Sequence, residues 1–87
     1  MTKNILLVDN EPDTTFTIKN IFEDNGEFKV DIFTDSTIAL KSYRSNFYDL
    51  VILDMKMPKM DGFELYTKIR EKDPKVTICF LTATDKL

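Results

Sequence analysis

Residues 49–62 read Asp-Leu-Val-Ile-Leu-Asp-Met-Lys-Met-Pro-Lys-Met-Asp-Gly and join a continuous apolar run to a turn that contains proline and glycine. The apolar run at residues 50–53 ends abruptly at Asp54, and the run at residues 5–8 ends in the same way at Asp9. Continuous aliphatic runs of this length are typical of strands that are buried on both faces, as in parallel sheets. A third such run, at residues 76–81, predicts a further strand of the same sheet.

Helical patterns separate these runs, and one more segment has the pattern of a strand. Residues 28–33 alternate between apolar and polar for most of their length, which predicts a strand wetted on one face at the edge of the sheet. Helices are expected to begin at Pro12, at residues 35–36 and near Met60. The order β-α-β-α-β-α-β predicts, through right-handed crossovers, a parallel sheet with helices on both faces.

The spacing of apolar residues predicts which side chains face the core. On the helices, the predicted inward positions are Ile18, Ile21, Phe22, Ala39, Leu40, Tyr43, Phe63, Leu65, Tyr66 and Ile69. Cys79 lies inside an apolar strand and is expected to be an inert core thiol. Phe16 lies about 200° around its helix from Ile18, so it is expected outside the core, either exposed or covered by another subunit.

Length and composition restrict the class of protein. The chain has 87 residues and a mass of 10.2 kDa, so residues 1–87 are expected to form one small domain. The net charge of −3 provides no basic excess that would favour nucleic acid or an anionic membrane. Histidine is absent and Cys79 is the single cysteine, which excludes His-dependent triads and an internal disulfide. No secretory signal and no apolar run of roughly 20 residues is present, so a cytoplasmic domain is expected.

Polar residues follow the ends of three predicted strands. Asp9, Asn10 and Glu11 follow the first strand, Asp54 follows the third, and Thr82 follows the fourth. Ligands of open parallel sheets bind beyond the carboxyl ends of the strands, so Asp9 and Asp54 converge if the first and third strands are neighbours. Oxygen ligands without histidine or cysteine favour a hard cation, Mg²⁺ or Mn²⁺. Carboxylate, cation and hydroxyl together predict a phosphoryl-acceptor site.

Three segments of this sequence resemble the receiver domains of two-component response regulators. Residues 5–13 (ILLVDNEPD) resemble the opening of such a domain, and residues 80–83 (FLTA) resemble its switch-residue strand. Residues 49–62 look like its phosphorylation segment: Asp, three residues, Pro, two residues, Asp-Gly. The resemblance implies a flavodoxin-like, doubly wound parallel sheet with strand order 2-1-3-4. A usual receiver has a fifth strand and two more helices, so residues 1–87 are expected to form a partial receiver domain of four strands and three helices.

The resemblance implies a role for each polar residue at the predicted site. Asp54 would be the phosphoacceptor, and Thr82 would be the switch hydroxyl that turns towards the phosphoryl group. The expected metal ligands are Asp9, Asn10, Asp54, the backbone carbonyl of Lys56 and, as an additional candidate, Glu11. Most receivers carry an acid at the position of Asn10, whose amide oxygen can bind Mg²⁺ but adds no charge. A weaker metal affinity than usual is therefore expected.

The resemblance also implies a signalling module and not a turnover enzyme. A histidine kinase or a phosphotransfer protein would donate the phosphoryl group to Asp54 with Mg²⁺ bound, and the product would signal through a change of conformation. The family's fifth-strand lysine and switch aromatic have no counterpart in residues 1–87. The alternative is therefore a truncated, switch-deficient receiver fragment that self-associates, as a homodimer or higher oligomer, through the fourth strand and the first helix.

Two other classes of protein fit the sequence less well. A phosphatase with an aspartate nucleophile needs a second carboxylate two residues later, where this chain has Lys56. A flavin-binding domain needs a phosphate-binding loop rich in Gly, Ser or Thr after the first strand, where residues 9–12 are acidic. A phosphatase assay and an absorbance scan would detect either class.

Overall fold

The structure, a computed structural model, describes residues 2–81, which form strands and helices in strict alternation. The strands are β1 (Lys3–Val8), β2 (Phe28–Phe33), β3 (Leu50–Asp54) and β4 (Thr77–Leu81). The helices are α1 (Pro12–Glu23), α2 (Ser36–Ser42) and α3 (Gly62–Lys72). The predicted order of elements is confirmed. The third helix begins two residues later than predicted, because the side chain of Asp61 caps it by accepting a hydrogen bond from the Glu64 N–H.

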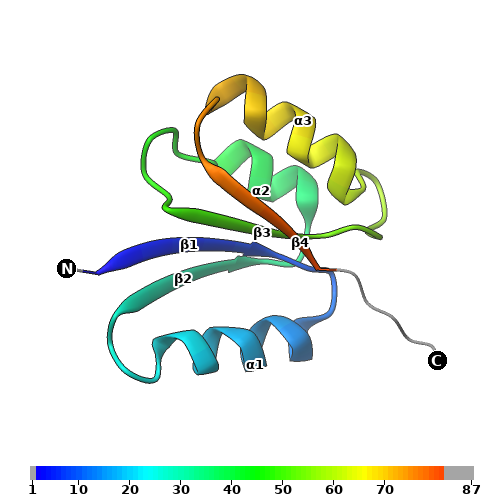
Figure 1. The fold of residues 1–87 in the computed structure, drawn as a ribbon. Helices are drawn as coiled ribbons and strands as arrows, with labels where there is room; N and C mark the ends of the chain where they lie inside the picture. Colours follow the sequence, from blue (N-terminus) through cyan, green and yellow to red (C-terminus); the bar gives the residue numbers. More distant parts are fainter. Residues whose placement is uncertain (1, 82–87) are drawn as a thin grey trace.

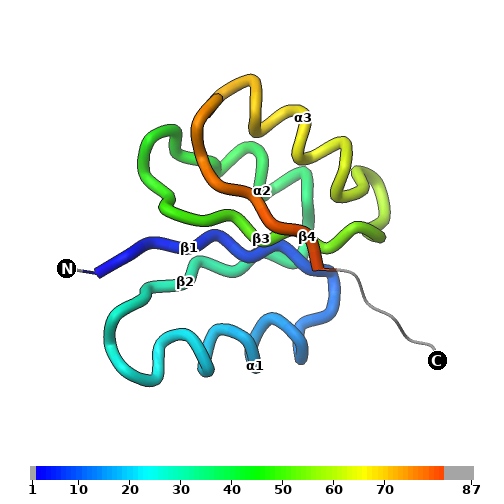
Figure 2. The backbone as a smooth tube through the Cα atoms, viewed as in Figure 1, coloured from blue at the N-terminus to red at the C-terminus, as the bar shows by residue number. Residues whose placement is uncertain are grey.

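All neighbouring strands are parallel, and their order across the sheet is β2-β1-β3-β4, as expected. Helix α1 covers one face of the sheet, and α2 and α3 cover the other (Figure 1). The chain returns to the same end of the sheet before every new strand, so all four strands have their carboxyl ends at the other end of the sheet (Figure 2). The predicted doubly wound sheet is therefore confirmed for the part of the chain that the structure describes.

The central strands are buried on both faces, which explains their continuous apolar sequences. In β1, Leu6 and Val8 pack towards α2 and α3, whereas Ile5 and Leu7 pack towards α1. All of these side chains are almost completely buried. The α2–α3 layer of the core is the larger, and it also contains Ala39, Tyr43, Tyr48, Val51, Leu53, Met57, Leu65, Ile69 and Val76.

Some residues predicted in the core lie outside it. Cys79 is exposed because β4 is the last strand of the described sheet and no helix among residues 2–81 covers that part of it. Phe63 is 61% exposed in the first turn of α3, where it stacks on the half-buried Tyr66. Ile21 is 69% exposed because α1 contacts the sheet through Ile18 and Phe22, and Phe22 itself is only half-buried.

Two other predictions about the surface are confirmed. Phe16 is exposed on α1, and the alternating strand β2 forms one edge of the sheet. Between residues 2 and 81, no helix is long and apolar enough to cross a lipid bilayer.

Candidate functional site

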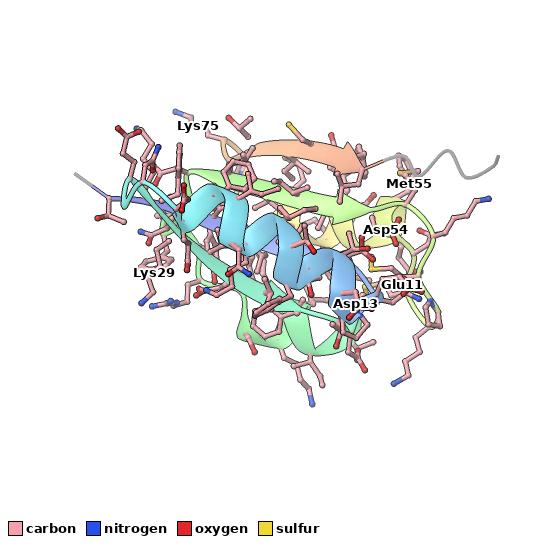
Figure 3. The ribbon with its side chains drawn as sticks, turned by 90° about the horizontal axis from the view of Figure 1, so that it is seen from below. Glu11, Asp13, Lys29, Asp54, Met55 and Lys75 are labelled. Atoms are coloured by element: carbon pink, nitrogen blue, oxygen red, sulfur yellow. The ribbon has the colours of Figure 1, made fainter. Side chains whose placement is uncertain are left out.

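The strand register brings two aspartates together at the carboxyl edge of the sheet. Val8 of β1 lies opposite Leu53 of β3. Asp9 follows Val8 directly, so it lies beside Asp54, the last residue of β3. The β1–α1 and β3–α3 loops therefore meet at this edge. Figure 3 shows Glu11, Asp13, Asp54 and Met55 at this end of the sheet.

The Asp9 carboxylate lies in an unfavourable electrostatic environment. Its residue is only 6% exposed, and its Oδ1 accepts a hydrogen bond from the backbone N–H of Glu11 at 2.9 Å. Burial raises the pKa of Asp9, the nearby carboxyl groups of Asp54 and Glu11 raise it further, and the bond from the Glu11 N–H offsets part of the increase. Within residues 2–81, no lysine or arginine forms an ion pair with Asp9 or Asp54. The described residues thus provide no cationic side chain that neutralises the negative charge of the pair.

The loop that follows Asp54 folds back closely against the end of β3. The backbone N–H of Lys56 donates to Asp54 Oδ1 at 3.3 Å, and the N–H of Gly62 donates to the carbonyl of Met55 at 3.0 Å. A Cβ atom at Gly62 would overlap the backbone oxygen of Asp54 and lie 2.9 Å from its carbonyl carbon. Only glycine allows this approach, so the Asp-Gly pair of the sequence shapes the loop that carries the Lys56 carbonyl.

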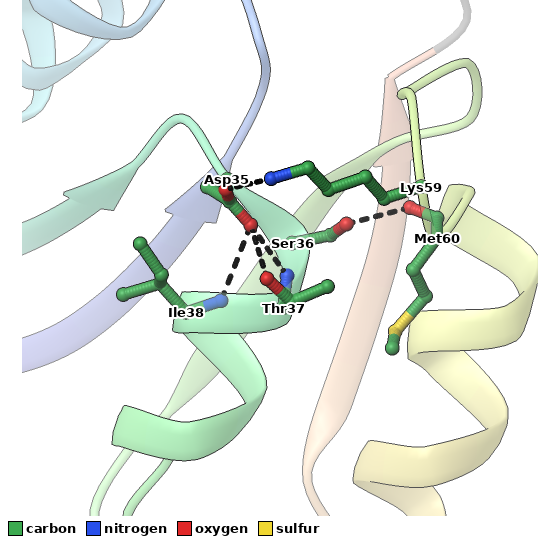
Figure 4. A network of polar contacts seen from close by, with 6 residues as sticks. All are labelled: Asp35, Ser36, Thr37, Ile38, Lys59 and Met60. Carbon is green, nitrogen blue, oxygen red and sulfur yellow. Dashed lines mark hydrogen bonds and ion pairs between the residues drawn. The ribbon is translucent and has the colours of Figure 1, made fainter.

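The far side of the same loop, residues 59–60, is attached to the beginning of α2 (Figure 4). The buried Ser36 hydroxyl donates a hydrogen bond of 2.7 Å to the carbonyl of Met60. Lys59 Nζ lies 3.0 Å from Asp35 Oδ2, and Asp35 also caps α2 through its other oxygen. The sequence indicated that Asp35 or Ser36 would cap α2 but gave no signal for these contacts, because their partners lie 24 residues further along the chain.

The structure places most of the predicted site residues in these two loops. Asp9 and Asp54 are adjacent, Asn10 is half-buried in the β1–α1 loop, and Lys56 is exposed two residues after Asp54. Glu11 is also exposed, its carboxyl group is near enough to Asp9 to raise the pKa of that residue, and it stays a candidate ligand. Among residues 2–81, no three acidic side chains converge as a metal-binding group. Thr82 lies outside the described residues.

The donor atoms at this edge suit a hard divalent cation. Two carboxylates, an amide side chain and a backbone carbonyl are oxygen ligands of the kind that Mg²⁺ and Mn²⁺ accept. A cation beside Asp9 and Asp54 would also neutralise the charge that now raises the pKa of Asp9. The residues that are present therefore fit the ion that the sequence predicted.

Comparison with known proteins agrees with this fold. Residues 5–87 match the family model described as the response regulator receiver domain. The chain belongs to this family. It is 37% identical over 82 residues to the response regulator Rre1 of Synechocystis, a match that covers 92% of this chain and 36% of Rre1. The chain thus spans about a third of the length of that relative.

Solved receiver structures superpose closely on this fold. The non-phosphorylated HemR receiver domain of Leptospira biflexa gives a TM-score of 0.88 at 31% identity, covering 99% of this chain and 68% of that one. The response regulator TrrA of Thermotoga maritima, in complex with Mg²⁺-BeF, gives a TM-score of 0.83 at 37% identity, covering 97% and 72%. TrrA has also been crystallised with the histidine kinase ThkA; that chain is 38% identical, with a TM-score of 0.85 and coverage of 98% and 72%.

Proposed function

We propose that this receiver domain accepts a phosphoryl group on Asp54, with Mg²⁺ held by Asp9, Asn10, Asp54 and the Lys56 carbonyl. The observation that carries the proposal is the pairing of Asp9 with Asp54, which concentrates uncompensated negative charge where parallel sheets bind their ligands. A divalent cation bound at this point would supply positive charge to both carboxylates.

The proposed reaction is a substitution at phosphorus. A carboxylate oxygen of Asp54 forms a bond to phosphorus as the bond from phosphorus to the donor breaks, which gives an aspartyl acyl phosphate. The leaving group keeps the bonding electron pair: it is the imidazole of a phosphohistidine or the acetate of acetyl phosphate. When bound, Mg²⁺ supplies positive charge that offsets the charge of the phosphoryl oxygens. The protein contributes the orientation of Asp54, which is fixed by β3 and by the loop that closes at Gly62.

The donor that we propose is a histidine kinase or a histidine phosphotransfer protein. The complex between TrrA and a histidine kinase supports a donor of this class, and the complex of TrrA with Mg²⁺-BeF supports Mg²⁺. Thr82 remains the proposed switch hydroxyl. The phosphoryl group stays on the protein as a signal, so we propose a signalling role without turnover of an external substrate.

The proposal is tested by intact mass spectrometry after incubation with acetyl phosphate, with and without Mg²⁺. We expect a gain of one phosphoryl group that requires Mg²⁺ and is lost in Asp54→Asn. Asp49→Asn is the matched control, because Asp49 lies just before the other end of β3, and within residues 2–81 its side chain accepts a hydrogen bond only from the Asn4 N–H. A folded protein that gains no phosphoryl group, or that gains it equally in Asp54→Asn, would contradict the proposal.

Self-association is the second candidate function, and the exposed side chains of Phe16, Cys79 and Phe80 favour it. These residues lie on α1 and β4, the elements expected to form a homodimer interface. Sedimentation equilibrium measures it directly. A dimer whose dissociation constant rises in Phe80→Ser would support this function, and a monomer at all accessible concentrations would exclude it.

A further inference from the structure

The β3–α3 loop, residues 55–61, carries the carbonyl of Lys56 and is held on its far side by α2. At its near side, the bond between Gly62 and Met55 closes the loop onto β3. At its far side, the only side chains of residues 2–81 that hydrogen-bond the loop from another element are those of Asp35 and Ser36.

The contact from Ser36 is buried and directional. Its residue is 2% exposed, and its hydroxyl donates to the Met60 carbonyl at 2.7 Å. A carbonyl in a loop has no regular partner, so losing this donor would leave it without a hydrogen bond in a partly buried place. The contact therefore fixes the loop four residues beyond Lys56.

The contact from Asp35 is made to a residue in an unfavourable backbone conformation. Lys59 has φ of +68°, in the left-handed region that residues other than glycine adopt at a cost. The Met60 N–H also bonds back to the carbonyl of Pro58 at 2.7 Å, which tightens the same turn. The ion pair of Lys59 with Asp35, at 3.0 Å, links this turn to the beginning of α2.

We propose that Asp35 and Ser36 are positioning residues for the metal site: through residues 59–60 they fix the Lys56 carbonyl where it can bind Mg²⁺. The inference rests on the proposed function and deepens it. It also predicts that Mg²⁺ binding stabilises the first turn of α2, because energetic coupling through two contacts is reciprocal.

Two variants break the two contacts separately. Ser36→Ala removes the hydroxyl bond, and Asp35→Asn removes the ion pair while keeping a good helix cap. The matched control is Ser45→Ala, which removes a serine hydroxyl that donates to a backbone carbonyl, that of Lys72, away from the metal site. Lys59→Met removes the same ion pair and should also weaken Mg²⁺ binding. Lys59→Arg keeps the charge and should bind Mg²⁺ like the unaltered chain.

The measurements are the Mg²⁺ dissociation constant by calorimetric titration, the rate of phosphorylation by acetyl phosphate, and hydrogen–deuterium exchange of residues 55–61. We expect Ser36→Ala to weaken Mg²⁺ binding about three- to tenfold, the equivalent of one partly buried hydrogen bond. Asp35→Asn should weaken it about twofold, and less at high salt, because that pair is exposed. At saturating Mg²⁺ the phosphorylation rate of both variants should return to the value of the unaltered chain, because the defect is one of metal affinity.

The results separate this inference from the proposed function. Unchanged Mg²⁺ affinity and unchanged exchange of residues 55–61 in Ser36→Ala, in a chain that binds Mg²⁺ normally, would overturn the inference alone. An equal loss in Ser45→Ala would also overturn it. Absence of Mg²⁺ binding and of phosphorylation in the unaltered chain would overturn the proposed function together with the inference.

Discussion

Two buried aspartates occupy opposite ends of the sheet and differ in how the protein treats their charge. Asp73, which follows α3, is 4% exposed and accepts hydrogen bonds from the Tyr43 hydroxyl at 2.8 Å and from the Asn46 N–H at 3.1 Å. Asp9 is 6% exposed, accepts one backbone N–H and faces a second carboxylate, that of Asp54. Similar burial therefore comes with opposite electrostatic surroundings.

The difference separates a structural carboxylate from a functional one. Asp73 ties the α2–β3 loop to the end of α3, and burial together with its bond to Asp73 raises the pKa of Tyr43. Near it, Arg70 donates to the carbonyls of Pro74 and Val76, which further closes this end of the molecule. At the other end, Asp9 accepts one hydrogen bond and lies beside the carboxyl group of Asp54. A charge that is buried without a partner destabilises the fold, and such sites persist where a ligand supplies the missing charge.

The largest effect is expected from removing Asp73. Asp73→Ala leaves the buried Tyr43 hydroxyl and the Asn46 N–H without their acceptor, so the free energy of unfolding should fall by about 3 kcal/mol. For a domain of this size, that corresponds to a decrease in Tm of at least roughly 10 °C. Urea unfolding followed by circular dichroism measures it.

Asp24→Ala is the control, because Asp24 is exposed and its side chain forms no hydrogen bond within residues 2–81. Tyr43→Phe should cost about 1 kcal/mol, and its effect should not add fully to that of Asp73→Ala, since both remove the same bond. Full additivity would show that Asp73 stabilises the fold by another route and would break the comparison.

Gly62→Ala disturbs the functional end without changing its charge. The new Cβ would overlap the Asp54 carbonyl, so we expect a loss of about 2 kcal/mol in the free energy of unfolding. Mg²⁺-dependent phosphorylation should fall as well, because the loop after Asp54 must move. Gly26→Ala is a useful contrast: the φ of Gly26, +79°, is unfavourable for alanine, but no atom lies within 4 Å of its missing Cβ. Normal phosphorylation in folded Gly62→Ala would show that the close approach is unnecessary.

The site residues at the carboxyl ends of the strands could be predicted from the sequence, whereas the contacts at the opposite end of the sheet could not. Two apolar runs that each end in aspartate define Asp9 and Asp54, because parallel strands deliver their carboxyl ends to one edge. The partners of Asp73 and Ser36 lie 24 to 30 residues away and depend on how helices and loops pack, which no local pattern encodes. The prediction that Cys79 is buried was wrong for a related reason. Strand β4 has the composition of a core strand, but the burial of Cys79 depends on which elements cover that strand.

Asp9→Asn should have effects of opposite sign on stability and on function. Without metal, the variant removes one of two adjacent carboxylates and should be more stable than the unaltered chain by about 1 kcal/mol. If Asp9 is a ligand, as proposed, the Mg²⁺ dissociation constant should rise at least about tenfold. Thermal unfolding with chelator and calorimetric titration measure the two effects. A loss of stability in the metal-free variant would place Asp9 in the same class as Asp73.

The smallest effect concerns pH and follows from the raised pKa of Asp9. Burial and the carboxylates of Asp54 and Glu11 make the folded state bind a proton at Asp9 more tightly than the unfolded state, whose reference pKa is 3.8. The contribution of Asp9 to the free energy of unfolding is therefore fully present below pH 3.8. It is lost as the pH rises through the folded-state pKa of Asp9, because in this range the folded state binds more protons than the unfolded state.

Other groups, such as Glu23, have a lowered pKa and give the opposite slope, so the difference between Asp9→Asn and the unaltered chain isolates Asp9. In chelator, this difference should be near zero at pH 3.5 and grow towards neutral pH, by less than about 1 kcal/mol per pH unit. Saturating Mg²⁺ should abolish this increase of the difference with pH, since the cation then stabilises the ionised carboxylate. A difference that stays constant with pH in chelator would mean that the charge of Asp9 is already balanced by the protein. The contrast with Asp73 would then rest on hydrogen bonds alone.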